Sequence, residues 1–136
     1  MSTLRYHKNA GSVYNLHYHF VWCPKYRKRV LCGPVEQQLK NLLAEKATEL
    51  DIQIEAMEVM PDHVQLFVLA SPVHAPQHIA NQLKGYTSRQ LRESFPHLRR
   101  QMPCLWSRSY YVGSAGAVTE ETVKRYIAEQ KTRSDK

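Results

Sequence analysis

The sequence predicts an α+β fold in which an antiparallel sheet carries its helices on one face. Three observations support this prediction. Residues 14–23 and 63–70 show strand patterns, residues 34–50 and 76–95 keep helical spacing, and the two kinds of segment follow each other in a mixed order. The chain has 136 residues, of which 43% are hydrophobic. This size and apolar content suit one core, so residues 1–136 are interpreted as a single domain.

The first strand and the first helix follow from residue periodicity. In residues 14–23 an aromatic or apolar side chain occupies every second position, which is typical of a strand. One face then carries Tyr14, Leu16, Tyr18, Phe20 and Trp22, and the other carries Asn15, His17, His19 and Val21. Pro24 ends the strand, and a basic loop, Lys25–Arg29, follows. Apolar residues three and four apart from Pro34 to Leu50 predict an amphipathic helix.

Residues 51–60 and 63–70 are predicted to form an antiparallel hairpin, because only a short turn connects two strand-like segments. The first segment is assigned an alternation through Ile52, Ile54, Ala56 and Glu58. In the second segment, His63 and Gln65 share one face, and the helix-covered face takes Val64, Leu66 and Val68.

The second half of the chain is predicted to hold a helix, a strand and a last helix. Residues 76–95 form the helix, which tolerates Gly85 at some cost in stability and ends at Pro96. Residues 105–112 form the strand, and the small residues 113–116 break it.

Thr119 is predicted to cap a C-terminal helix that runs to about Gln130, and the tail 131–136 is expected to fray. The complete order, βαββαβ plus a C-terminal helix, is the ferredoxin-like plan. The second face of its sheet is expected to be open to a ligand or a partner, although the plan alone does not decide a function.

The charge of the chain points to a polyanionic partner. Lys and Arg total 19 against 12 Asp and Glu, which gives a formal net charge of +7. Basic residues gather in 1–30 and 84–108, whereas 36–65 is acidic, so we expect a positive side that attracts phosphate backbones. A merely solvated basic surface is the alternative.

Composition also excludes several classes of protein. No apolar run approaches the roughly 18 residues of a membrane span, and the basic N-terminal segment lacks the apolar stretch of a signal peptide. We therefore expect a soluble cytoplasmic protein without a membrane partner. Cys23, Cys32 and Cys104 are odd in number and lack CxxC spacing, so neither a disulfide framework nor a zinc knuckle is predicted.

Two pairs of side chains are candidates for chemistry. His63 and Gln65 lie two apart on a strand, so an imidazole nitrogen and an amide oxygen could hold one metal ion. Tyr126 and Gln130 lie four apart on a helix, and a tyrosine can act as the nucleophile in phosphoryl transfer. From spacing alone each pair has a structural alternative: an exposed polar pair at a strand start, and a tyrosine that simply packs.

His17 and His19 also lie two apart, but among aromatic residues and without an acid nearby, so a structural role is favoured. An RNA-recognition module would need aromatic residues on the open sheet face. Tyr18 and Phe67 could serve there, although no aromatic-glycine pattern surrounds them.

Five segments carry a resemblance to one family. They are Phe20–Arg27, Met60–Val68 (MPDHVQLFV), Leu83–Arg89, Tyr110–Gly113 and Val123–Gln130 (VKRYIAEQ). In this order they resemble the first strand and loop, the HUH segment (histidine, hydrophobic residue, histidine), the second helix, the last strand and the tyrosine helix of TnpA-type transposases of small insertion sequences, the IS-two-hundred-like group. The resemblance covers nearly the whole chain.

The resemblance implies an HUH single-tyrosine transposase, a DNA-binding enzyme of DNA recombination in a bacterial or archaeal cell. Tyr126 would attack the scissile phosphate of single-stranded DNA and become linked to its 5′ side, and strand transfer would reverse this step. His63, Gln65 and Gln130 would hold Mg²⁺ or Mn²⁺. A homodimer is implied, in which the tyrosine helix of one subunit meets the metal site of the other, and DNA hairpins at the element ends are the implied partners.

Gln65 departs from the family pattern, which has a second histidine at this position. An amide oxygen is a harder ligand than an imidazole nitrogen, so we expect Mg²⁺ or Mn²⁺ rather than zinc, bound weakly until a DNA phosphate adds negative charge. A tolerated exchange of ligands is favoured over a decayed site.

Basic side chains are expected to position the DNA backbone without reading its sequence. The candidates are Lys25, Arg27, Lys28, Lys84 and Arg89. Two other functions stay open: a domesticated REP-associated tyrosine transposase that acts on genomic hairpins, and a non-catalytic ferredoxin-like domain that binds nucleic acid.

Overall fold

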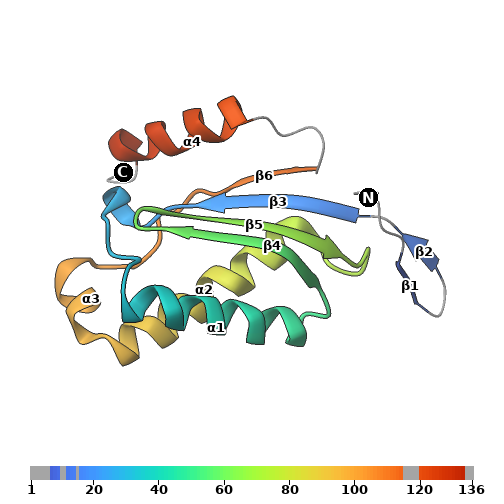
Figure 1. The fold of residues 1–136 in the computed structure, drawn as a ribbon, viewed down its shortest axis with the longest axis horizontal. Coiled ribbons are helices and arrows are strands. Elements are labelled where there is room, and N and C mark those ends of the chain that lie inside the picture. Colours follow the sequence, from blue (N-terminus) through green and yellow to red (C-terminus); the bar gives the residue numbers. More distant parts are fainter. Residues whose placement is uncertain (1–6, 10–11, 15, 115–119, 134–136) are drawn as a thin grey trace.

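The structure, a computed structural model, describes residues 7–9, 12–14, 16–114 and 120–133. Its centre is a four-stranded antiparallel sheet in the order β4-β5-β3-β6 (Figure 1). The elements are β1 (His7–Asn9), β2 (Ser12–Tyr14), β3 (Leu16–Trp22), η1 (Lys25–Arg27, a 3₁₀ turn), α1 (Pro34–Glu49), β4 (Gln53–Met60), β5 (His63–Ala70), α2 (Pro76–Ser94), α3 (Pro96–Gln101), β6 (Tyr111–Ser114) and α4 (Glu120–Arg133). The predicted α+β fold with a C-terminal helix is confirmed.

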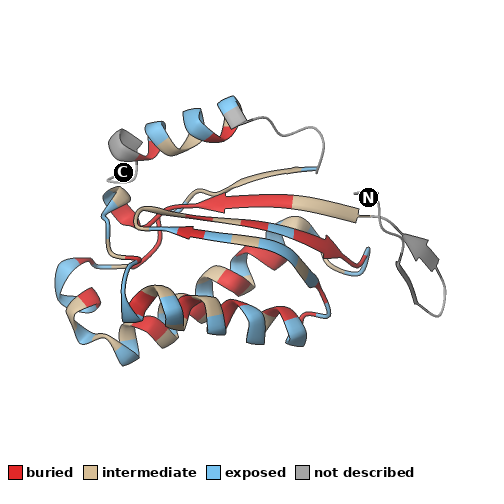
Figure 2. Cartoon of the chain, viewed as in Figure 1, coloured by how far each residue is buried: buried red, intermediate tan, exposed pale blue. Residues whose placement is uncertain are grey.

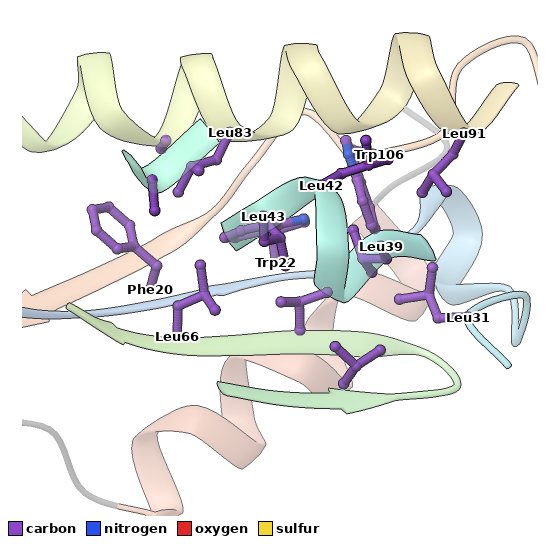
Figure 3. Close-up of a cluster of buried hydrophobic side chains, with 14 of the residues drawn as sticks. Phe20, Trp22, Leu31, Leu39, Leu42, Leu43, Leu66, Leu83, Leu91 and Trp106 are labelled. Carbon is purple, nitrogen blue, oxygen red and sulfur yellow. The ribbon is translucent and has the colours of Figure 1, made fainter. Parts of the chain in front are cut away.

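Helices α1 and α2 cover one face of the sheet, and the hydrophobic core lies between these two layers (Figure 1; Figure 2). Phe20, Trp22 and Leu66 point from the strands into this layer, where they meet Leu39 of α1 and Leu83 of α2 (Figure 3). All five are fully buried. Burying one such side chain stabilises the fold by about 1.5–3 kcal/mol, so this layer holds the strands firmly in register.

Helix α4 lies on the opposite face of the sheet, alongside β6 (Figure 1). Its Val123 is buried. Nη1 of Arg27 donates a hydrogen bond to the carbonyl oxygen of Ile127 at 3.3 Å, which ties α4 to η1. The sheet face that we expected to be open is therefore partly covered by the C-terminal helix.

Strand β4 departs from the predicted alternation. Ile54 and Ala56 pair with consecutive residues of β5, so Glu55 is an extra residue, a β-bulge. Before the bulge Ile54 packs against the core, whereas beyond it Val59 is buried and Glu58 is exposed. The assignment of Glu58 to the face of Ile54 is therefore wrong, because each extra residue reverses the face of everything beyond it.

The second half of the chain differs from prediction at several boundaries. Pro96 ends α2 but also opens the short helix α3, since proline is favoured in the first turn of a helix. Residues 105–110 run irregularly apart from one bridge at Trp106, and β6 includes Gly113, which was expected to break it.

The C-terminal helix α4 continues to Arg133, three residues into the predicted tail. The predicted cap Thr119 and the residues 115–116 lie outside the described residues. Within the described part of the chain, none of the helices combines the length and apolar character that a membrane crossing requires.

Candidate functional site

Polar side chains gather at the tip of the β4–β5 hairpin. The register pairs Glu58 with Gln65 and Met60 with His63. Cross-strand partners share a face, as do residues two apart, so Glu58, Gln65 and His63 project from the same side of the hairpin. Nε2 of Gln65 lies 3.4 Å from Nε2 of His63, so the structure brings the first predicted pair together.

His63 is held in one orientation by its neighbour in the turn. Its Nδ1 lies 2.9 Å from Oδ1 of Asp62, and Oδ2 of the same carboxylate lies 3.3 Å from Nε of Arg27. Because Nδ1–H donates a hydrogen bond to Asp62, the lone pair of the neutral ring is on Nε2. A histidine whose one nitrogen is bound by a carboxylate while the other presents a lone pair is the usual arrangement of a metal ligand.

The amide of Gln65 links three side chains. Its nitrogen donates to Oε1 of Glu58 at 3.1 Å and lies within reach of His63. Its oxygen accepts from Nε2 of His19 at 3.0 Å. The amide therefore connects strands β3, β4 and β5 on one face of the sheet.

His19, on the neighbouring strand β3, holds the Gln65 amide in place through its hydrogen bond. The ring is buried and stacks on Phe67, with 4.0 Å between the ring centroids. Burial lowers the pKa of His19, and the hydrogen bond that the ring donates to Gln65 opposes this only in part, so the neutral form of the ring is favoured. The preferred structural role for the two histidines fits these contacts, but Nδ1 of His17 lies 2.7 Å from Glu55, so the expectation of no acid nearby was wrong.

Tyr126 and Gln130 meet a different set of partners. Oε1 of Gln130, which is buried, accepts hydrogen bonds from the hydroxyls of Ser107 at 3.1 Å and Ser109 at 2.7 Å. The Tyr126 hydroxyl lies 3.1 Å from Oγ of Ser109, and its ring centroid is 6.2 Å from that of Tyr111. The second predicted pair is thus also held together, over β6 and the segment that leads into it.

The first pair stands on β5, whereas the second is carried by helix α4 and lies over β6 and the segment that leads into it. Val21 of β3 pairs with Gln65 on one side and with Tyr111 on the other, so β3 lies between them. Two strand spacings amount to about 10 Å between backbones. Among the residues that the structure describes, no three His, Cys, Asp or Glu side chains form a group suited to a metal ion, so a cation at His63 depends on amide or DNA ligands as well.

Comparison with known proteins identifies the family. A family model described as IS200-like transposase matches residues 12–130. The chain belongs to the IS200-like transposase family. The ISDra2 transposase TnpA of Deinococcus radiodurans is 37% identical over 125 residues, which cover 90% of this chain and 89% of that protein. The transposase for insertion sequence element IS200 of Salmonella typhimurium is 28% identical over 123 residues, which cover 89% and 80%.

Solved structures share the fold of this IS200-like transposase. A crystal structure of a protein from Deinococcus radiodurans, described as a transposase, has a TM-score of 0.85 at 37% identity and covers 91% of this chain and 97% of its own. A REP-associated tyrosine transposase bound to a REP hairpin has a TM-score of 0.56 at 13% identity and covers 93% and 68%. The second likeness concerns the fold alone.

The five basic residues predicted to contact DNA differ in exposure within this IS200-like transposase. Lys28 and Arg89 are exposed, although α2, which carries Arg89, covers the sheet face opposite His63 (Figure 1). Arg27 is already paired with Asp62 in the β4–β5 turn and bonded to the carbonyl oxygen of Ile127 in α4, and Lys25 is buried. Lys28 is therefore the residue of this set that is most accessible beside the candidate site.

Lys84 serves a structural purpose. Its Nζ donates to the carbonyl oxygens of Ser107, Arg108 and Ser109 at 2.8, 3.3 and 3.1 Å. Burial lowers the pKa of Lys84 to about 8. All three ammonium hydrogens are directed at one segment, so we leave Lys84 out of the proposed DNA surface and assign it to holding the serines that bind Tyr126 and Gln130.

Sequence reasoning did not single out Asp62, Glu58, or the serines 107 and 109. A signal existed for the first two. Asp62 directly precedes His63, and a two-residue turn between Met60 and His63 already pairs Glu58 with Gln65. The serines gave no such signal, because they lie in an irregular segment whose partner helix is far along the chain.

Proposed function

We propose that this protein is a metal-dependent single-strand DNA endonuclease and strand transferase that cuts and rejoins the ends of an insertion sequence. The orientation of His63 is the observation that carries the proposal. Asp62 accepts a hydrogen bond from the Nδ1–H group, and the Nε2 lone pair faces Gln65 on the side of the sheet where α4, the helix that carries Tyr126, also lies. Membership of the IS200-like transposase family supports the same reaction class.

The residues present fit a divalent cation of the Mg²⁺ or Mn²⁺ type. An imidazole nitrogen and an amide oxygen would come from His63 and Gln65, and Gln130 would be the third protein ligand. When bound, the cation would polarise the scissile phosphate and help to orient it. Gln130 is bonded to Ser107 and Ser109 in this structure, so its part in the site requires α4 to move or to come from a second subunit.

The chemical step conserves the number of phosphodiester bonds. The Tyr126 oxygen attacks the scissile phosphorus, the bond from phosphorus to the 3′ oxygen breaks, and the leaving oxygen takes up a proton. The product is a 5′-phosphotyrosine and a 3′-OH. Attack by a different 3′-OH reverses the step and returns the proton to Tyr126, so joining needs no external energy source.

The proposed partners are hairpins of single-stranded DNA and a second copy of the chain. The net charge of +7 favours a polyanion. A protein of the same fold has been solved bound to a REP hairpin. Within one chain, β3 lies between the strand of His63 and Gln65 and the strand over which Tyr126 lies. In a homodimer, α4 of one subunit would bring Tyr126 next to His63 and Gln65 of the other.

An adduct assay tests the proposal. The protein is incubated with single-stranded element ends and Mn²⁺, and a covalent protein–DNA product is sought on a denaturing gel. We expect an adduct with the wild type and none with Tyr126→Phe, which should still bind the hairpin. An adduct of normal yield from Tyr126→Phe would refute the assigned nucleophile. Metal-independent binding without any adduct would instead support a non-catalytic nucleic-acid-binding domain.

A further inference from the structure

We infer that Glu58 supplies the anionic ligand of the divalent-cation site that His63 and Gln65 form. This inference rests on the proposed function, because it concerns the same metal site. It begins with the Gln65 amide nitrogen, which is 3.1 Å from Oε1 of Glu58 and 3.4 Å from Nε2 of His63. Two lone pairs therefore converge on one positively polarised group, which is the arrangement that a cation would favour even more strongly.

The backbone gives Glu58 this position. The turn after Met60 pairs Glu58 with Gln65, and the bulge at Glu55 directs Glu58 away from the core, whereas the preceding part of β4 packs against it. Glu58 therefore stands on a paired strand, close to its end, rather than on a loop, so the sheet fixes the position of its backbone.

The charge of Glu58 is not neutralised nearby. Its hydrogen bond goes to the neutral amide of Gln65, and among the residues that the structure describes no Lys or Arg forms an ion pair with it. The other carboxylate at this tip, Asp62, is already bonded to His63 and Arg27. Glu58 is thus the acid at this site that has a charge available for a cation.

A carboxylate removes the weakness expected of this donor set. Imidazole and amide ligands are neutral, and Mg²⁺ and Mn²⁺ bind most strongly to sites that include carboxylate oxygen. A half-turn of the Gln65 amide would place its oxygen beside Glu58 and His63. Without a cation the facing oxygens would repel each other, so the nitrogen faces Glu58 in this structure.

Manganese binding without DNA tests the inference, with electron paramagnetic resonance of unbound Mn²⁺ as the readout. We expect the wild type to bind one Mn²⁺, His63→Ala to lose it, and Glu58→Gln to bind at least about tenfold more weakly, since changes around a ligand alone cost about that much. Glu58→Asp should recover part of the affinity. Glu55→Gln is the matched control from the same strand and should bind as the wild type does.

The outcomes separate the two claims. Wild-type affinity in Glu58→Gln, together with loss in His63→Ala, would overturn the role of Glu58 and leave the metal site of the proposed function intact. A wild type that binds no Mn²⁺ at millimolar concentration, with or without a hairpin oligonucleotide, would overturn both. A thermal melt of each variant shows that it is folded, so that weaker binding is not mistaken for unfolding.

Discussion

The two faces of the sheet are made by the same strands but by different interactions. On the face of α1 and α2, side chains such as Trp22 and Leu66 are fully buried and held by apolar packing (Figure 3). On the face of α4, Gln65 and His19 are held by hydrogen bonds and ring stacking. Residues of one strand that point to the α1 and α2 face therefore stabilise the fold, and those that point to the α4 face form the candidate site. Substitutions one position apart should have different consequences.

The largest difference in stability is expected between Leu66→Ala and Gln65→Ala. Removing Leu66 leaves a cavity in the core and should lower the free energy of unfolding by about 2–5 kcal/mol. Removing Gln65 deletes hydrogen bonds at a partly exposed site and should cost less than about 1.5 kcal/mol. Urea denaturation measures both. Equal losses in the free energy of unfolding would show that both faces of the sheet contribute alike to stability.

The next effect concerns Lys84, a partly buried residue whose ammonium is bonded to the segment that holds α4. Its pKa of about 8 in the folded protein is below its ordinary value of 10.5, so between these values the unfolded chain binds more protons. The free energy of unfolding should therefore rise with pH across this window, by up to about 3 kcal/mol. Lys84→Met should lack this rise, as measured by urea denaturation at several pH values.

Lys40→Met is the control for this pH dependence, because Lys40 of α1 is partly exposed and its ammonium lies 3.0 Å from Glu36 one turn away. It should keep the wild-type rise. A Lys84→Met protein whose stability follows the wild-type pH curve would show that Lys84 is not the titrating group.

A smaller, local effect is expected from Ser109→Ala. The Ser109 hydroxyl bonds to Gln130 and lies 3.1 Å from the Tyr126 hydroxyl, so its loss should weaken the attachment of α4 by about 1 kcal/mol. Amide hydrogen exchange should then be about fivefold faster in α4 and unchanged in β5. Ser94→Ala, at the exposed end of α2, should alter neither. Unchanged exchange in α4 would mean that other contacts hold this helix.

The smallest effect is expected for the link between Arg27 and Asp62, which are 3.3 Å apart and partly exposed. A double-mutant cycle of Arg27→Ala and Asp62→Ala should give a coupling energy of about 0.2–1 kcal/mol. A coupling energy well above this range would reveal that the turn at His63 and the contact of η1 with α4 act as one unit.

Elements defined by local pattern were predictable from the sequence. Strand β5 has the predicted bounds, and α1 ends one residue early, because alternation, helical spacing and the residues Gly33 and Pro34 are all local signals. The bulge at Glu55 was not predictable, because it exists only in relation to the partner strand. The short helix α3 was missed because Pro96 was interpreted as an end and not also as a beginning.

The candidate site shows the same limit. Periods of two and of four residues predicted that His63 would accompany Gln65, and that Tyr126 would accompany Gln130. What surrounds each pair comes from other elements: Glu58 and His19 for the first, and the serines of the segment before β6 for the second. Partners brought together across strands depend on register, which a single sequence specifies only weakly.

The extra residue in β4 has an evolutionary consequence. Because the hairpin tip is aligned by its own turn and by β5, an insertion or deletion between α1 and the bulge can be absorbed before the strand reaches Glu58. The hairpin tip would then keep its geometry while the segment between α1 and Glu55 varies in length. Relatives are therefore expected to tolerate length variation on the α1 side of Glu55 and to reject it on the side of the turn.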